Sequence, residues 1–237
     1  MTTQNHKIKT HASDQQHDEK RPLFKKLRSQ PPALKRSLPR LTERPTILIV
    51  CEGENTEPSY FRKFRLSSAT IKAVGNGNST VALVKQAIKL AGQRPYEQVW
   101  CVFDKDDFSS RDFNEAIRLA KASGFGVAWS NQAFEYWLVL HFTDHQGNRM
   151  NRKDYHTVIN NHIRPMGASY NGKEDKQVSD TLFDLLTGVD PATKCRRTVL
   201  AINRARRNHQ SLAHLSPAEQ ESSTTVFQLV EELMKHM

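Results

Sequence analysis

The chain has 237 residues, of which 37% are hydrophobic and 25% charged, and its formal net charge at pH 7 is +10. This length suffices for one large domain with a buried core, and the basic balance favours a polyanionic partner. Three cysteines without paired spacing exclude a disulfide scaffold and a CxxC metal site, and they fit a reducing cytosol. No apolar run approaches a membrane span and the N-terminus is unlike a signal peptide, so we expect a cytoplasmic protein without a membrane partner.

The positive charge is concentrated near the N-terminus. Residues 1–44 contain eleven Lys or Arg and four Asp or Glu, so they carry +7 of the net +10. The same segment has four prolines and little hydrophobic periodicity, which is typical of disordered chain. We therefore predict a disordered basic arm over residues 1–44, which either follows a phosphate backbone or keeps the protein soluble.

Strand and helix patterns alternate from residue 46 to residue 142. Short apolar or β-branched runs predict strands at Thr46–Cys51, Thr70–Val74, Gln98–Phe103 and Phe125–Trp129. Apolar residues at helical spacing predict helices at Ser59–Leu66, Thr80–Ala91, Asp112–Ala122 and Phe134–Phe142. This alternation is typical of a parallel sheet flanked by helices, so we predict an α/β domain over residues 45–142.

Residues 143–237 show no convincing strand pattern. Segments that look helical lie near 152–163, 177–187, 194–208 and 224–236, and polar loops join them. We expect this part to form a mainly helical extension that packs on the α/β domain.

Acidic residues follow the predicted strands where each strand ends. Glu52 comes directly after the first strand, Asp104 directly after the third, and Glu135 a few residues after the fourth. Functional residues of open parallel sheets collect beyond the carboxyl ends of the strands, and grouped acids repel one another unless a cation neutralises them. Oxygen ligands without a nearby His or Cys favour Mg²⁺ or Mn²⁺ over zinc. Asp106 can turn toward the same ion as Asp104, whereas Asp107 would point elsewhere.

Three sequence blocks resemble a protein family. ILIVCEGENTEPSYF contains a Glu-Gly pair at Glu52, FDKDDF contains an Asp-x-Asp pair at Asp104 and Asp106, and SNQAFEYWLVLHF contains Glu135. Glu-Gly followed by a later Asp-x-Asp resembles the Toprim fold of topoisomerases, primases and OLD-family nucleases. The three blocks together, with STTVFQLVEEL at 223–233, closely resemble the RloB-like family of bacterial restriction and anti-phage loci, over roughly residues 45–237.

The resemblance implies a Toprim-like fold and a phosphodiesterase that cleaves RNA, with tRNA as the leading substrate, by means of Mg²⁺ or Mn²⁺. It implies that Glu52 is a metal ligand or general base and that Asp104 and Asp106 bind the metal. Glu57 stands near a second acid of related nucleases, although its spacing from Glu52 is five residues rather than four, and a plain helix N-cap is the alternative. Glu135 is the candidate ligand of a second ion, with a structural salt bridge as the alternative. Related defence systems further imply an abortive-infection effector paired with an AAA or ABC-type ATPase.

Basic residues in the C-terminal part are candidates for contacts with nucleic acid. Six Lys or Arg and no acid lie between residues 194 and 207. On a helix, Arg197, Arg204 and Arg207 share one face, which either meets RNA phosphates or is simply solvated. Lys173 and Lys176 lie in the loop sequence YNGKEDK, from which they can reach the scissile phosphate.

Three classes of function remain open. A metal-dependent nuclease would use the acids as ligands. A HAD-like phosphatase would use Asp104 and Asp106 as nucleophile and acid, although this pair follows a late strand with Glu-Gly already upstream. A non-catalytic Toprim-like module would bind nucleic acid or a partner without cleavage. His141 lies among apolar residues, where a core histidine is the commoner role and a catalytic one the alternative.

Overall fold

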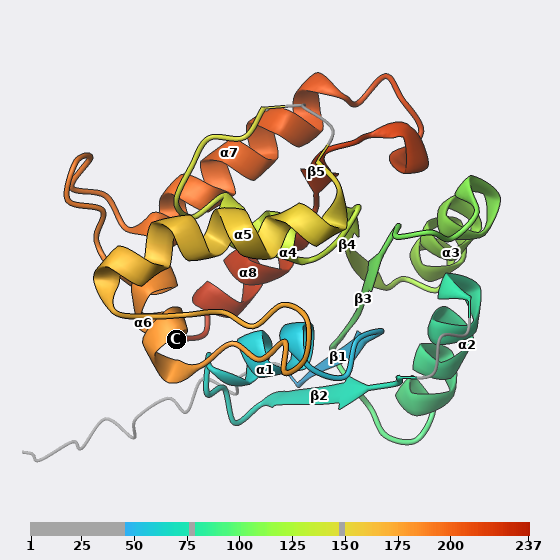
Figure 1. Cartoon of the computed structure of the whole chain (residues 1–237). Helices are drawn as coiled ribbons and strands as arrows, with labels where there is room; N and C mark the ends of the chain where they lie inside the picture. The colour runs from blue at the N-terminus through green and yellow to red at the C-terminus, as the bar shows by residue number, and fades with distance from the viewer. Residues whose placement is uncertain (1–45, 76–78, 147–149) are drawn as a thin grey trace, which may run out of the picture. The chain divides into compact units, whose positions relative to one another are not determined.

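A computed structural model describes residues 46–75, 79–146 and 150–237, which build a mostly parallel five-stranded sheet with helices on both faces (Figure 1). The strands are β1 (Ile47–Cys51), β2 (Ala69–Ala73), β3 (Gln98–Asp104), β4 (Gly126–Asn131) and β5 (Ser223–Thr224). Their order is β2-β1-β3-β4-β5, and all neighbours are parallel except β4 and β5. The predicted α/β class is confirmed, and the predicted basic arm lies outside the described residues.

The helices follow the strands and then make up most of the C-terminal part. They are α1 (Thr56–Arg62), α2 (Thr80–Ala91), α3 (Ser110–Ala122), α4 (Glu135–Val139), α5 (Arg152–Ile163), α6 (Asp180–Thr187), α7 (Arg197–Ser211) and α8 (Val226–Met234), with 3-10 turns η1 (Arg164–Met166) and η2 (Pro217–Glu219). The helical segments predicted after residue 143 are present as α5 to α8. None of the helices in the described ranges combines the length and apolarity that crossing a bilayer requires.

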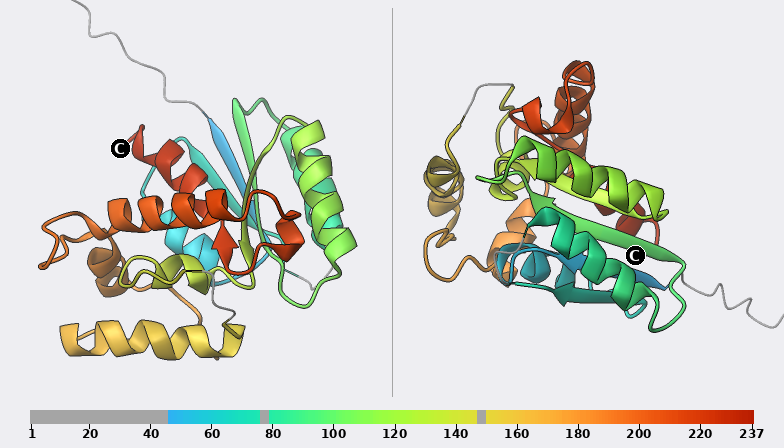
Figure 2. Two further views of the ribbon diagram at one scale, coloured as in Figure 1. Left: turned by 90° about the horizontal axis from the view of Figure 1, so that it is seen from above. Right: turned by 90° about the vertical axis from the view of Figure 1, so that its right-hand side faces the viewer.

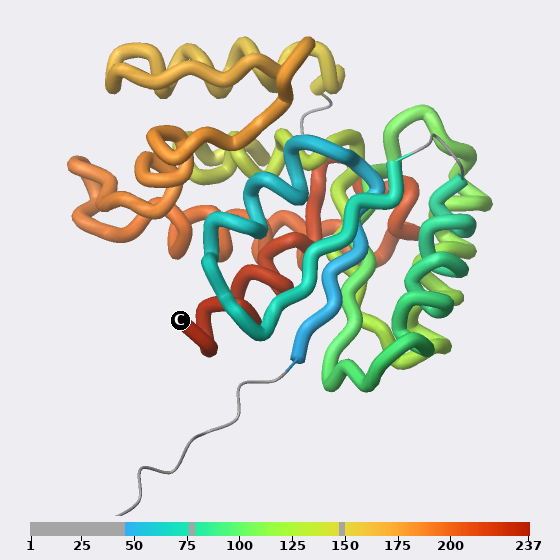
Figure 3. Tube along the Cα trace, turned by 90° about the horizontal axis from the view of Figure 1, so that it is seen from below, coloured from blue at the N-terminus to red at the C-terminus, as the bar shows by residue number. Residues whose placement is uncertain are grey.

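Both faces of the sheet are buried, because alternate side chains of each strand enter opposite cores. In β1, Leu48 and Val50 pack with residues of α2 and α3, whereas Ile47 and Ile49 pack with residues of the remaining helices. Figure 2 shows α2 and α3 together on one face of the sheet, with α1 and α4 to α8 on the other. Figure 3 shows α5 as the outermost helix of that second layer, where it packs on α4.

The C-terminal segment returns to the sheet and covers the outer edge of β4. Thr224 pairs with Ser130 in the antiparallel ladder, and the Thr225 amide donates to the Trp129 carbonyl at 2.8 Å. The Thr225 hydroxyl in turn accepts from the Trp129 amide at 3.0 Å. The prediction that no strand follows residue 143 is therefore wrong, because β5 is a two-residue strand of hydroxyl side chains with no apolar alternation.

Candidate metal centre

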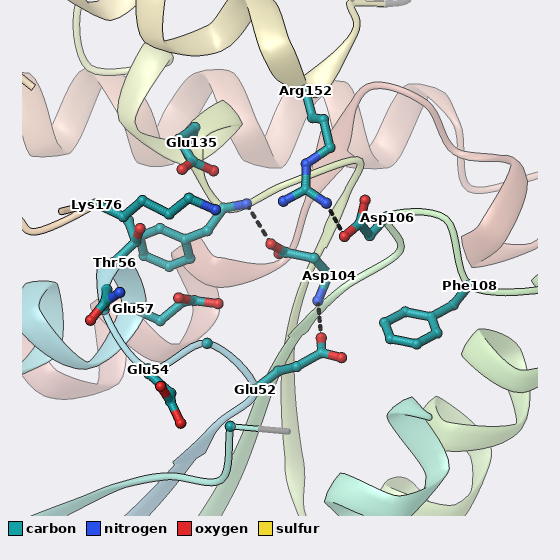
Figure 4. A pocket seen from close by; sticks show the side chains of 14 residues that line it. Glu52, Glu54, Thr56, Glu57, Asp104, Asp106, Phe108, Glu135, Arg152 and Lys176 are labelled. Carbon is teal, nitrogen blue, oxygen red and sulfur yellow. Dashed lines mark hydrogen bonds and ion pairs between the residues drawn. The ribbon is translucent and has the colours of Figure 1, made fainter. Parts of the chain in front are cut away.

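The predicted acids meet in one pocket beyond the carboxyl ends of β1 and β3 (Figure 4). The pocket has a volume of about 520 Å³. Its acidic lining residues are Glu52, Glu54, Glu57, Asp104, Asp106 and Glu135. All five acids that the sequence proposed as metal ligands are therefore brought together, and we call this hollow the acidic pocket.

Glu52 and Asp104 are neighbours because β1 and β3 are adjacent parallel strands that end at the same edge of the sheet. Glu52 directly follows β1, and its Oε2 accepts a hydrogen bond from the Asp104 amide at 3.2 Å. Burial raises the pKa of Glu52, while this hydrogen bond and the positive charge of Arg152 act in the opposite direction. The first acid is thus fixed to the backbone of the third strand.

Glu57 lies inside the first turn of α1, and its side chain is buried with 6% exposure. Asn55 is the N-cap, so the alternative that Glu57 only caps the helix is wrong. A Cβ at position 53 would lie 2.2 Å from Glu57 Oε2, so Gly53 leaves the space that the carboxylate occupies. Burial raises the pKa of Glu57 to about 7, with a further contribution from repulsion by Glu135 and Glu52, against hydrogen bonds from its own backbone and that of Gly53.

Asp104, the last residue of β3, is half-buried among the other acids of the pocket. Its Oδ2 accepts from the Phe134 amide at 3.0 Å, and its Oδ1 is buried without a hydrogen-bond partner among the described residues. Burial raises the pKa of Asp104 well above its ordinary value, and repulsion from Glu57 and Glu135 adds to the rise. The charge of such a group is neutralised either by a proton, as the raised pKa indicates, or by a cation at Oδ1.

Glu135 is the first residue of α4 and faces the pocket from the side opposite Glu57 (Figure 4). Its Oε1 accepts from the Tyr170 hydroxyl at 2.8 Å. The same hydroxyl lies 3.1 Å from Thr56 Oγ1 in α1. Within the described ranges Glu135 has a hydroxyl partner and no ion pair, which differs from the structural salt bridge considered above.

Asp106 lies in the loop after β3 with a backbone φ of 40°, in the left-handed region. Two backbone hydrogen bonds hold this turn: Lys105 donates to the Ser130 carbonyl at 2.8 Å, and Asp106 to the Gln132 carbonyl at 3.0 Å. The carboxylate forms an ion pair with Arg152 of α5, and its Oδ1 is buried without a partner in the described part of the chain. Strain of this kind at a non-glycine residue concentrates at functional sites.

The donor set suits a hard divalent cation. All candidate ligands are carboxylates, and two of their buried oxygens, on Asp104 and Asp106, lack partners among the described residues. Across those residues, no three His, Cys, Asp or Glu side chains stand in ligating geometry. By chemistry and charge the acids suit Mg²⁺ or Mn²⁺, but their side chains are not arranged around one point. Arg152 must also leave Asp106 before that side chain can serve as a ligand.

Contrary to the prediction from the sequence, Arg197 does not belong to an exposed basic face of α7. Its side chain is buried, at 6% exposure of the residue, and its Nη1 donates to the Leu185 carbonyl at 3.1 Å. The guanidinium also lies over the Phe142 ring, 5.7 Å from its centroid. The prediction that Arg197 meets RNA phosphates is contradicted, because this side chain joins α6, α7 and the segment after α4 inside the protein.

Arg204 and Arg207 are more accessible but have partners within the protein. Arg204 Nη1 donates to the Leu140 carbonyl at 2.7 Å, and Arg207 forms an ion pair with Asp144. Their contact with RNA stays a prediction. His141 is buried at 1% exposure, and burial lowers its pKa to about 3, which agrees with the predicted core histidine.

Arg152 was not assigned to the site from the sequence, yet it lines the acidic pocket. Lys176, which the sequence proposed with Lys173 as a contact of the scissile phosphate, lines the same pocket. Lys173, which was assigned, lines a neighbouring hollow instead. The sequence feature that could have indicated Arg152 is the pair of basic residues in NRKDYH, at the start of the helix predicted over residues 152–163. Nothing in that spacing indicates that the helix start faces the strand-end acids.

No curated protein and no solved structure matches the chain. The family model described as "RloB-like protein" matches residues 47–233, which include every acid of the pocket. This match covers well over half of the sequence, and so the chain belongs to the RloB-like family.

Proposed function

We propose that this protein is a metal-dependent Toprim-type phosphodiesterase that cleaves RNA, with tRNA as the leading substrate, as the effector of an anti-phage abortive-infection system. One observation supports the catalytic part most: carboxylates at the end of β1, in α1, at the end of β3 and in α4 line a single pocket. Burial raises the pKa of Glu52, Glu57 and Asp104, and repulsion by other acids adds to the rise for Glu57 and Asp104. Membership of the RloB-like family is compatible with this activity. The RNA substrate and the role in defence rest on the resemblance.

In the proposed reaction, some of the acidic residues bind the metal ion and Glu57 exchanges a proton. Glu52, Asp104 and Asp106 would hold Mg²⁺ or Mn²⁺, with Glu57 and Glu135 as further ligands. When bound, the metal supplies positive charge that offsets the charge of the phosphodiester and acidifies water. Tyr170 keeps Glu135 oriented through its hydroxyl. Glu57, with a pKa of about 7, can take up or release a proton at neutral pH.

A cleavage assay with defined metals tests the proposal. Purified protein is incubated with total RNA and with tRNA in Mg²⁺, in Mn²⁺ and in EDTA, and the new RNA ends are sequenced. We expect cleavage only with metal, and its loss in Glu52→Gln. Turnover of 4-nitrophenyl phosphate without RNA cleavage would instead favour the phosphatase alternative. RNA that stays intact in both metals would contradict the proposal.

A second candidate is a non-catalytic module that binds nucleic acid. The ion pair between Arg152 and Asp106 favours it, because a guanidinium already neutralises one of the proposed ligands. RNA binding that is insensitive to EDTA, with no cleavage under any metal condition, would support this candidate.

The partner and compartment follow from the same proposal. An AAA or ABC-type ATPase is the proposed gate of the nuclease, and this part of the proposal rests on the resemblance to related defence systems. Cleavage that requires such an ATPase, encoded beside this protein, together with ATP would support the pairing. The proposed compartment is the cytoplasm, where tRNA is present.

A further inference from the structure

A second hollow adjoins the acidic pocket and has the opposite charge. Its volume is about 490 Å³. It is lined by Asp107, Glu135, Arg152, Lys153, His156, Gly172, Lys173 and Lys176. Four of these residues are Lys or Arg and two are acids, and we call this hollow the basic pocket.

The two hollows share a wall. Glu135, Arg152 and Lys176 line both of them, so the sign of the charge changes across these three side chains. Arg152 and Lys176 are the two Lys or Arg residues among the described residues that line the acidic pocket, and Figure 4 shows both on the same side of it as Glu135. A polyanion is repelled by a pocket of six carboxylates, and cations at its rim are what allow a phosphate chain to approach.

The lysines of the basic pocket have no acidic partner among the described residues. Lys153, Lys173 and Lys176 form no ion pair within the described part of the chain, and the first two are exposed. Arg152, by contrast, already neutralises Asp106. Lysines that converge on a hollow without acidic partners leave positive charge available for an anionic ligand.

The loop that carries two of these lysines is held in a defined conformation. Asn171 Oδ1 accepts from the Lys173 amide at 3.2 Å, and the Lys176 amide donates to the Asn171 carbonyl at 2.8 Å. A Cβ at position 172 would lie 2.7 Å from His156 Cβ, so Gly172 lets the loop pack directly on α5. The basic pocket is thus formed by two segments that contact each other closely.

We propose that the basic pocket binds phosphates of the RNA strand that flank the scissile phosphodiester, with Lys153 and Lys173 as the contacts farthest from the acids. Arg152 and Lys176 lie between the flanking phosphates and the reacting one. This inference rests on the proposed nuclease function, and it assigns the strand a direction of approach from α5 toward β3. Lysine as a point charge suits backbone contacts that carry no sequence information.

The test compares two double variants with the same change of charge. Lys153→Glu/Lys173→Glu alters the basic pocket, whereas Lys85→Glu/Lys89→Glu alters two exposed lysines of α2 on the opposite face of the sheet. Binding of a fluorescent single-stranded RNA is measured in EDTA across a series of salt concentrations. We expect the first variant to bind at least about 10-fold more weakly and its log–log salt slope to fall by about 1.4, the value for two lost phosphate contacts on a single strand.

Cleavage separates this inference from the proposed function. With Mn²⁺, the loss caused by Lys153→Glu/Lys173→Glu should be at least about 10-fold greater for RNA than for bis(4-nitrophenyl) phosphate, which has no flanking phosphates. Equal RNA affinity of this variant and the wild type, or an equal loss in the α2 variant, would overturn the basic pocket as a binding site. A wild type that binds RNA through these lysines but cleaves neither substrate would overturn the nuclease and leave the binding site standing.

Discussion

Arg152, the first residue of α5, forms an ion pair with Asp106, in the loop that follows β3. This pair joins the outermost helix of its layer to the acidic edge of the sheet (Figures 2 and 4). The charge of Arg152 also opposes the rise in the pKa of Glu52. In the metal-free protein, the guanidinium therefore supplies part of the positive charge that the acids require.

Replacement of Arg152 by Gln should separate metal binding from RNA binding. Without the guanidinium, Asp106 is free and a cation in the pocket meets less repulsion, so Mn²⁺ should bind about 10-fold more tightly. RNA should bind more weakly, because a phosphate contact is lost. Isothermal titration with Mn²⁺ and anisotropy with labelled RNA measure the two effects. Arg152→Lys keeps the charge and serves as the control, and unchanged Mn²⁺ affinity in Arg152→Gln would contradict the competition.

Asp104→Asn should abolish activity without loss of stability. Asn retains an acceptor for the Phe134 amide but removes a charge that Glu57 and Glu135 repel. We expect RNA cleavage to fall at least about 100-fold while the melting temperature in EDTA stays equal or rises. The matched control is Glu54→Gln, since Glu54 is an exposed acid of the same pocket outside the proposed ligands. A lower melting temperature with full activity would assign Asp104 a purely structural role.

Asp106→Asn tests less directly whether an acid of the pocket binds metal rather than stabilises the fold. Its carboxylate already has Arg152 as a partner, so the substitution also removes an ion pair. We expect the same loss of cleavage as in Asp104→Asn, but a lower melting temperature in EDTA. A melting temperature of Asp106→Asn at or above that of the wild type would show that the ion pair with Arg152 does not stabilise the metal-free fold.

Stability without metal should depend on pH through Glu57. Its pKa rises from 4.5 to about 7 on folding, so the folded protein keeps a proton that the unfolded chain releases. The stability linked to this proton is complete below the unfolded pKa and is lost as the pH rises through about 7. Mn²⁺ affinity should change in the opposite direction, because ligands bind in the deprotonated form.

Melting curves in EDTA from about pH 5 to about pH 8.5 measure this dependence. Glu57→Gln is the comparison, since it cannot titrate and should lose less stability over the same range. The same pH profile in both proteins would show that Glu57 is charged at neutral pH.

Gly172→Ala should disturb the basic pocket without a change of charge. The new Cβ would lie 2.7 Å from His156 Cβ and 3.1 Å from the Tyr170 ring, so the loop must move away from α5. We expect a destabilisation of about 1–3 kcal/mol and weaker RNA binding. Gly92→Ala is the control, because its Cβ would meet only ordinary contacts from 3.6 Å outward. Wild-type RNA affinity in Gly172→Ala would show that RNA binding by the lysines does not depend on the close packing of the loop on α5.

The sheet and the acids could be predicted because their signals are local. Continuous apolar runs indicate buried parallel strands, and the strands begin and end within two residues of the predicted bounds. Glu52 and Asp104 come together because parallel strands bring their carboxyl ends to one edge, a rule that needs no structure. The start of α1 was placed three residues late, because Thr56 and Glu57 are polar residues that nonetheless lie buried.

The cations could not be assigned because their roles depend on tertiary contacts. Arg197 and Arg152 both lie at the start of a helix, and their local sequences are similarly basic. The first is enclosed by the Leu185 carbonyl and Phe142, whereas the second crosses to Asp106. The packing of α5 and α7 decides which of the two arginines contacts the acids. The spacing of residues within each helix does not indicate this packing.

The antiparallel pairing of β5 with β4 also affects when the acidic pocket can form during synthesis of the chain. The loop that carries Asp106 is bonded to carbonyls at the end of β4, and the outer edge of β4 is paired by residues 223–225. A growing polypeptide presents Glu52 early, but Trp129 lacks its native backbone partner until Thr225 has emerged from the ribosome. We therefore expect translation to produce a chain whose acids are assembled late, so that unfinished polypeptides do not carry a working centre.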